Sequence, residues 1–122
     1  MIFMDKVNWQ KINNLLPVIV QHATTCEVLM LGHMNPEALE KTLAEKKVTF
    51  FSRTKNRLWT KGETSGNFLH VVDMSLDCDQ DALLILVAPV RPTCHTREDS
   101  CFHQFTQQGT SHWTWFANWS SI

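Results

Sequence analysis

The segment 77–81 combines a cysteine, Cys78, with three carboxylates at alternate positions, Asp77, Asp79 and Asp81. On an extended backbone the three carboxylates would share one face, and the thiol would point to the other. Carboxylate oxygens suit a hard cation such as magnesium, whereas a thiolate suits zinc. An EF-hand loop is excluded, because alanines stand where that loop needs its glycine and its last glutamate. The alternative is a solvated acidic turn at the end of a strand.

Two further cysteines, Cys94 and Cys101, lie seven positions apart in a polar stretch. With Cys78 they make three thiolates, the arrangement of a catalytic zinc site whose fourth position is left to water. The alternatives are a disulfide, which a cytoplasmic chain disfavours, or inert buried thiols. Cys26 opens an apolar run and is interpreted as a packing residue. His95 adjoins Cys94, so it is either a proton-transfer group beside that water or an ordinary histidine.

A basic segment, 52–61, carries four cations and Trp59, and a turn with two glycines follows at 62–67. Basic and aromatic side chains together are typical of single-stranded nucleic-acid binding or of binding to a phosphorylated nucleotide. The turn adds amide groups, hydroxyls and the neighbouring Lys61, which together could hold a phosphate. It lacks the spacing of a P-loop, and a solvated hairpin tip is the alternative.

The composition limits the classes of protein that fit. The chain has 122 residues, 43% hydrophobic and 19% charged, which predicts one ordinary globular domain rather than a disordered chain. The net charge of −1 disfavours binding to nucleic acid or an anionic membrane by bulk charge. The longest apolar run, 82–90, is too short to cross a bilayer. No signal peptide is visible at the start, so we expect a cytoplasmic chain with reduced cysteines.

These residues must be positioned by a small set of elements. Asn35, Pro36 and Glu37 predict a helix start, and the helix should run to about Lys47. Extended segments are predicted on both sides of the helix, at 17–22, 26–32, 48–53, 57–60, 68–76 and 82–90. The first two should form a hairpin. The expected fold is therefore α+β, with a mainly antiparallel sheet and one clear helix.

Several stretches, taken in order, resemble the phosphoribosyl-AMP cyclohydrolases of histidine biosynthesis. They are GHMNPEAL at 32–39, FSR at 51–53, LWTKGETSGN at 58–67, DCDQD at 77–81, PTCHT at 92–96 and SCF at 100–102. The resemblance extends roughly from Trp9 to Phe102. It implies a cyclohydrolase domain at 1–104, followed by an uncharged Trp-rich tail of unknown role at 105–122. Some relatives continue into a second, helical pyrophosphohydrolase domain, for which this chain is expected to be too short.

The resemblance implies hydrolysis of the adenine ring of phosphoribosyl-AMP between N1 and C6. It also implies a homodimer that needs zinc and magnesium. The zinc ligands would be Cys78, Cys94 and Cys101, drawn from both chains, and the magnesium ligands would be Asp77, Asp79 and Asp81. Zinc-bound water would supply the nucleophile at neutral pH, with His95 moving a proton.

The substrate contacts implied by the resemblance lie in the basic segment and its turn. Arg53, Lys61, Thr64 and Ser65 would contact phosphate, while Trp59 would stack on the base or only pack. The sequence departs from the family's pattern at His33, where an aromatic residue is common, and in the uncharged tail. Two other functions stay open: a zinc-dependent nucleotide-binding module without catalysis, and a small single-stranded RNA binder.

Overall fold

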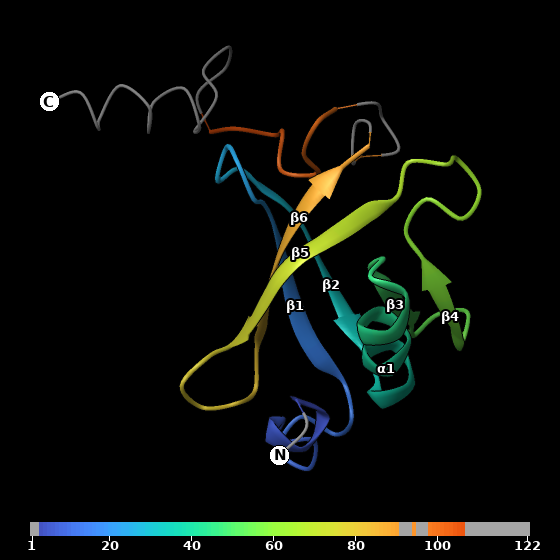
Figure 1. Cartoon of the computed structure of the whole chain (residues 1–122), viewed down its shortest axis with the longest axis vertical. Coiled ribbons are helices and arrows are strands. Elements are labelled where there is room, and N and C mark those ends of the chain that lie inside the picture. The colour runs from blue at the N-terminus through green and yellow to red at the C-terminus, as the bar shows by residue number, and fades with distance from the viewer. Residues whose placement is uncertain (1–2, 91–93, 95–97, 107–122) are drawn as a thin grey trace, which may run out of the picture.

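The computed structural model describes residues 3–90, 94 and 98–106 of the chain, as a four-stranded sheet, a two-stranded sheet and one α-helix (Figure 1). The elements, in chain order, are a 3₁₀ helix η1 (Phe3–Lys6), β1 (Leu16–His22), β2 (Val28–Met34), α1 (Pro36–Glu45), β3 (Thr49–Ser52), β4 (Arg57–Thr60), β5 (Leu69–Leu76) and β6 (Leu83–Pro89). The predicted α+β class is confirmed, with its single α-helix among the described residues.

The larger sheet has the strand order β2-β1-β6-β5. The predicted hairpin of β1 and β2 is confirmed, and β5 pairs with β6 in the same antiparallel way. One pairing differs from a wholly antiparallel sheet: β1 lies parallel to β6, with Val18 opposite Leu83 and His22 opposite Val87. The sheet is therefore mixed but mainly antiparallel. Its two central strands, β1 and β6, bury alternate side chains.

The second sheet, β3 and β4, lies with α1 on one side of the larger sheet (Figure 1). Contact between the layers is close at Gly32 of β2. A Cβ atom there would lie 2.5 Å from Cε1 of Phe50, whose residue is only 2% exposed. A side chain at this position would therefore push the β3–β4 layer away from β2.

Helix α1 begins as predicted. Asn35 caps it, because its Oδ1 accepts a hydrogen bond of 2.8 Å from the amide of Ala38, and Pro36 occupies the first turn. The buried stripe includes Leu39 and Thr42. The Thr42 hydroxyl donates to the carbonyl of Ala38 at 2.8 Å and accepts from the Thr49 amide at 3.0 Å. The helix is thereby tied to the start of β3.

Cys26 is not the packing residue expected from the sequence. It is exposed in the turn between β1 and β2, with a φ of 65°. The apolar run that it was assigned to begins two residues later, at Val28. No helix among the described residues is long and apolar enough to cross a membrane.

Candidate functional site

The acidic segment forms the turn between β5 and β6, at one end of the larger sheet (Figure 1). Its three aspartates place one carboxylate oxygen each within 4.8 Å of one another, an arrangement made by Asp77, Asp79 and Asp81. The backbone is turned rather than extended, with Gln80 at a φ of 61°. The turn therefore brings the three carboxylates together. The sequence pattern instead predicted that an extended strand would place them on one face.

Hydrogen bonds inside the turn hold this cluster together. One oxygen of Asp77, Oδ1, accepts from the amide of Asp81 at 3.0 Å and from that of Ala82 at 3.2 Å. Ligand oxygens on an octahedral magnesium ion lie about 3 to 4 Å apart, so small side-chain rotations would bring the cluster to that spacing. The donor set therefore fits a hard cation.

A lysine from the N-terminal segment lies against the cluster. The ammonium of Lys11 is 2.6 Å from Oδ2 of Asp81. Its hydrogen bond and charge lower the pKa of Asp81, and the same contact raises the pKa of Lys11. Lys11 thus neutralises part of the cluster's charge, and a metal ion at Asp81 would compete with it. The sequence reasoning missed this residue, because the two positions are distant along the chain.

The thiols of Cys94 and Cys101 are neighbours at the other end of the sheet. Desolvation and the adjacent Cys94 raise the pKa of the Cys101 thiol to about 11, and Lys61 acts in the opposite direction. The segment is tied to β2, since the Cys101 amide donates to the carbonyl of Leu29 at 2.7 Å and Ser100 Oγ donates to that of Val28 at 2.6 Å. Two thiols held together fit a soft cation such as zinc.

Cys78 lies far from these two thiols within one chain. It is in the turn before β6, whereas Cys94 follows the opposite end of that strand (Figure 1). The seven residues of β6 span roughly 20 Å. Sulfur atoms that share one zinc ion lie about 4 Å apart. One chain in this conformation therefore does not bring Cys78 to the other two cysteines.

His103 is a candidate that the sequence reasoning passed over. Its Nε2 lies 3.7 Å from Sγ of Cys94. The signal was its position, two residues after Cys101 in a Cys-x-His spacing. His95, the predicted proton-transfer residue, lies outside the described residues.

The proposed substrate residues lie on β4 and its flanks. Trp59 packs its ring 5.7 Å from that of Phe50, and the Lys61 ammonium lies 5.7 Å from the Trp59 ring centre. Trp59 is therefore partly used in packing. The Lys61 charge lowers the pKa of the Cys101 thiol, so this ammonium lies within electrostatic range of the thiol pair. The exposed Arg53 lies near His33, whose pKa is lowered by desolvation and by this charge.

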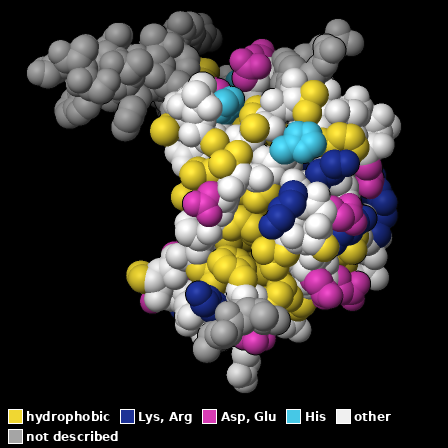
Figure 2. All heavy atoms as spheres, in the orientation of Figure 1, with side chains coloured by type: hydrophobic (Ala, Val, Ile, Leu, Met, Phe, Trp, Pro, Cys, Tyr) yellow, Lys and Arg dark blue, Asp and Glu magenta, His cyan; other side chains and the backbone are white. Residues whose placement is uncertain are grey.

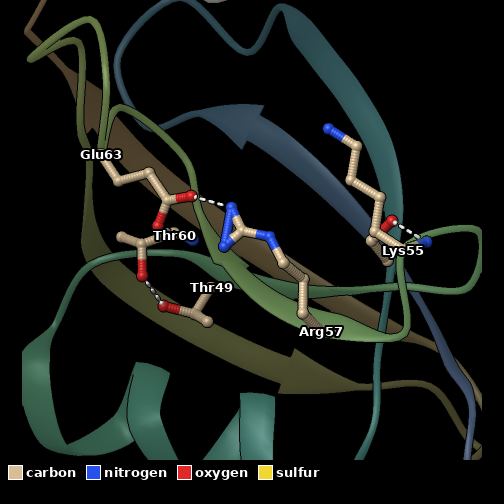
Figure 3. A network of polar contacts seen from close by, with 6 residues as sticks. Thr49, Lys55, Arg57, Thr60 and Glu63 are labelled. Atoms are coloured by element: carbon tan, nitrogen blue, oxygen red, sulfur yellow. Dashed lines mark hydrogen bonds and ion pairs between the residues drawn. The ribbon is translucent and has the colours of Figure 1, made fainter.

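Internal contacts occupy some of the groups at 57–67 that were expected to hold a phosphate. Arg57 Nη2 donates to Glu63 Oε1 at 2.5 Å, and the other carboxylate oxygen accepts from the amide of Thr60 (Figure 3). The Gly66 amide donates to the carbonyl of Gly62. The side chains of Thr64 and Ser65 are exposed. The hydroxyls of Thr64 and Ser65 and the ammonium of Lys61 are therefore better candidates for phosphate contact than the backbone amides of this turn.

An open pocket adjoins the acidic turn. It lies between η1, the end of β5 and the turn that follows β5, and its lining includes Lys6, Asp77 and Cys78. Polar groups, a cation and a candidate metal ligand therefore border one hollow at this end of the sheet.

The fold and these two sets of side chains define a small α+β protein with three convergent carboxylates at one end of its larger sheet and two neighbouring thiols at the other. A family model for phosphoribosyl-AMP cyclohydrolase matches residues 30–103. The chain belongs to the phosphoribosyl-AMP cyclohydrolase family.

Curated relatives carry the name "Histidine biosynthesis bifunctional protein HisIE". The chain is 73% identical over 108 residues to that of Pasteurella multocida, covering 88% of this chain and 54% of the relative. It is 67% identical over 120 residues to that of Haemophilus influenzae, covering 93% and 54%. The Escherichia coli K12 protein is 63% identical over 103 residues, covering 84% and 51%. The chain spans about half the length of the curated relatives it matches.

Proposed function

We propose that this chain hydrolyses the N1–C6 bond of the adenine ring of phosphoribosyl-AMP, a step of histidine biosynthesis. The observation that carries the proposal is the family match over 30–103, which contains every proposed metal ligand and substrate contact. The convergence of three carboxylates within 4.8 Å supports the same proposal, because the resemblance to this family implies a site for a hard cation. The cytoplasmic location expected from the sequence stays a prediction.

Two metal ions are proposed, each with the donors that suit it. Cys78, Cys94 and Cys101 would hold zinc, and the three aspartates of the β5–β6 turn would hold magnesium. Zinc bound by three thiolates lowers the pKa of a bound water toward 7 and so supplies hydroxide at neutral pH.

The chain's own residues would bind substrate and move protons. His95, beside Cys94, would take a proton from the attacking water and return one to N1 as the ring opens. Lys61, whose charge reaches the thiol pair, would hold the phosphate nearest the reacting base, with Thr64 and Ser65 donating their hydroxyls. Arg53 would contact the phosphate from the turn that follows β3, while Trp59 would offer the exposed part of its ring to the base.

We further propose that each zinc site is shared between two chains of a homodimer. The roughly 20 Å length of β6 separates Cys78 from the other two cysteines, so a second copy is the direct way to complete the thiolate set. Two-fold symmetry would create two equivalent sites.

The activity is tested with purified protein, phosphoribosyl-AMP, zinc and magnesium, by following the ultraviolet change of ring opening. Turnover that needs both metals is expected. Tight binding of phosphoribosyl-AMP with no ring opening would indicate a nucleotide-binding module rather than an enzyme. Binding of single-stranded RNA in preference to the nucleotide would favour the RNA-binding alternative.

The shared site is tested by mixing two inactive variants, Cys78→Ser and Cys94→Ser, which are unfolded together and refolded. In a mixed dimer one site receives both defects and the other receives none. Random pairing makes about half of the dimers mixed, so roughly a quarter of wild-type activity should return. If each site lay within one chain, every site would keep a defect. A mixture as inactive as its parents, with chain exchange confirmed by mass, would therefore exclude the shared site.

A further inference from the structure

Two basic side chains, Lys47 and His70, lie next to each other where β5 begins. The two residues form an isolated antiparallel bridge between the segment after α1 and β5. Beside this bridge, the Val48 amide donates to the carbonyl of Leu69 at 3.0 Å. Val48 and Leu69 are fully buried, so the alternating positions Lys47 and His70 direct their side chains together to the opposite side.

An aromatic ring holds the ammonium of Lys47 in place. Its Nζ lies 4.2 Å from the ring centre of Phe68, and the rings of Phe68 and His70 are 6.4 Å apart. A cation–π contact leaves N–H groups of the ammonium free to donate to other acceptors. Because the ring limits the conformations of Lys47, less side-chain entropy is lost when this ammonium binds an anion.

The charge of this basic pair is not neutralised by a carboxylate. Among the described residues, the ion pairs are those of Lys11 and Arg57, and neither involves Lys47 or His70. The exposed imidazole of His70 adds at least one N–H donor. Basic side chains and a histidine also come together in the upper part of the face shown in Figure 2. A cation with further N–H donors beside it suits a phosphate group, which offers several acceptor oxygens.

The basic pair lies at the end of the larger sheet that carries the thiols. The carbonyl of Phe68 accepts a hydrogen bond of 3.3 Å from the amide that follows β6, the strand that leads to Cys94. On the other side, the Lys61 amide donates to the carbonyl of Val48 at 3.0 Å. Lys47 therefore precedes the residue to which Lys61, a proposed phosphate ligand, is bonded.

Phosphoribosyl-AMP carries two phosphate groups, one on each of its ribose rings, and these rings are attached to different nitrogens of the base. We propose that Lys47 and His70 form a second phosphate site, which binds the phosphate group that Lys61 does not hold. The proposal rests on the proposed function. The two ammonium groups are anchored separately, Lys47 over Phe68 and Lys61 at 5.7 Å from the ring centre of Trp59, so each is available to its own phosphate.

The test adds ribose 5-phosphate to the zinc-loaded protein at constant pH and follows the ring signals of His70 by NMR. These signals are identified by their loss in His70→Gln. We expect ribose 5-phosphate to shift them and ribose to leave them in place. Lys47→Met keeps an apolar stem over Phe68 but loses the charge, so it should weaken this binding about ten-fold. The matched control is Lys46→Met, since Lys46 is the exposed lysine that ends α1, and this variant should bind as the wild type does.

The substrate itself gives a second readout. Lys47→Met should raise the KM for phosphoribosyl-AMP about ten-fold with little change in kcat, because the lost contact is made equally in the ground state and the transition state. The response of His70 to ribose 5-phosphate should persist in Lys61→Met. Its loss there would mean that one phosphate uses both lysines, and would overturn a separate second site.

The remaining outcomes separate this site from the function. Unmoved His70 signals at millimolar ribose 5-phosphate would overturn the second phosphate site, whether or not the wild type opens the substrate ring. Equal weakening of binding in Lys47→Met and Lys46→Met would overturn it as well. A wild type that binds ribose 5-phosphate through Lys47 but does not open the ring would refute the proposed function and leave the phosphate site in place.

Discussion

Sγ of Cys94 lies 3.7 Å from Nε2 of His103, so a proposed zinc ligand has an imidazole within contact distance. A ring N–H directed at a thiolate orients it and stabilises its charge. We therefore expect His103→Ala to weaken zinc binding about 10-fold, measured by competition with a chromophoric chelator. His103→Gln, which can still offer an N–H group, should recover part of that loss.

The control for this prediction is His70→Ala, since His70 is an exposed residue of β5. That variant should bind zinc as the wild type does. Equal zinc affinity in the His103 and His70 variants would show that the contact with Cys94 has no role in metal binding.

Replacement of Lys11 should tighten magnesium binding. The ammonium of Lys11 is paired with Asp81, and a metal ion must displace it to use that carboxylate. Lys11→Met is expected to raise magnesium affinity about two- to five-fold, measured by calorimetry at low salt. Asp79→Asn should have the opposite effect, and it should leave zinc content unchanged. Weaker magnesium binding in Lys11→Met would mean that the lysine supports the site.

The four cysteines should differ in their effect on zinc. Cys101 belongs to the thiol pair, whereas Cys26 is an exposed turn residue between β1 and β2. The wild type should carry about one zinc per chain by elemental analysis, Cys26→Ser should keep it, and Cys101→Ser should lose most of it. Equal zinc in both variants would remove Cys101 from the proposed ligand set.

His33 should make the folded chain sensitive to acid. Desolvation and the Arg53 charge lower the pKa of His33 below its ordinary value of 6.5. The unfolded chain then binds the proton more readily, so the free energy of unfolding falls as the pH drops through about 6.5. His33→Phe should give a flatter dependence in urea unfolding between roughly pH 7.5 and 5.5. An unchanged slope would show that other groups govern acid stability.

The close contact of the two layers at Gly32 should be sensitive to a single methyl group. Gly32→Ala would place a Cβ against the buried ring of Phe50, and we expect a loss of ~1–3 kcal/mol in the free energy of unfolding. The double variant Gly32→Ala, Phe50→Leu should lose less than the sum of its two single variants. Additive losses would mean that the strain arises elsewhere.

Local features of this protein could be predicted from the sequence, because they depend on residues close together along the chain. The Asn35 cap and the hairpin of β1 and β2 both follow from neighbouring residue types. The metal preferences of the aspartates and cysteines stay predictions. The prediction was wrong for Cys26, because a left-handed turn overrode the apolar pattern that followed it.

Tertiary structure alone decided how distant segments meet. Strand composition does not specify a partner, so the parallel pairing of β1 with β6 could not be predicted. The contact of Lys11 with Asp81 depends on the path of the N-terminal segment. The same holds for the thiols. The local pattern predicts that Cys78 and Cys94 are zinc ligands, but it is the strand β6 between them that places them at its opposite ends. Long-range pairing is set by packing across the whole chain, which no short stretch of sequence encodes.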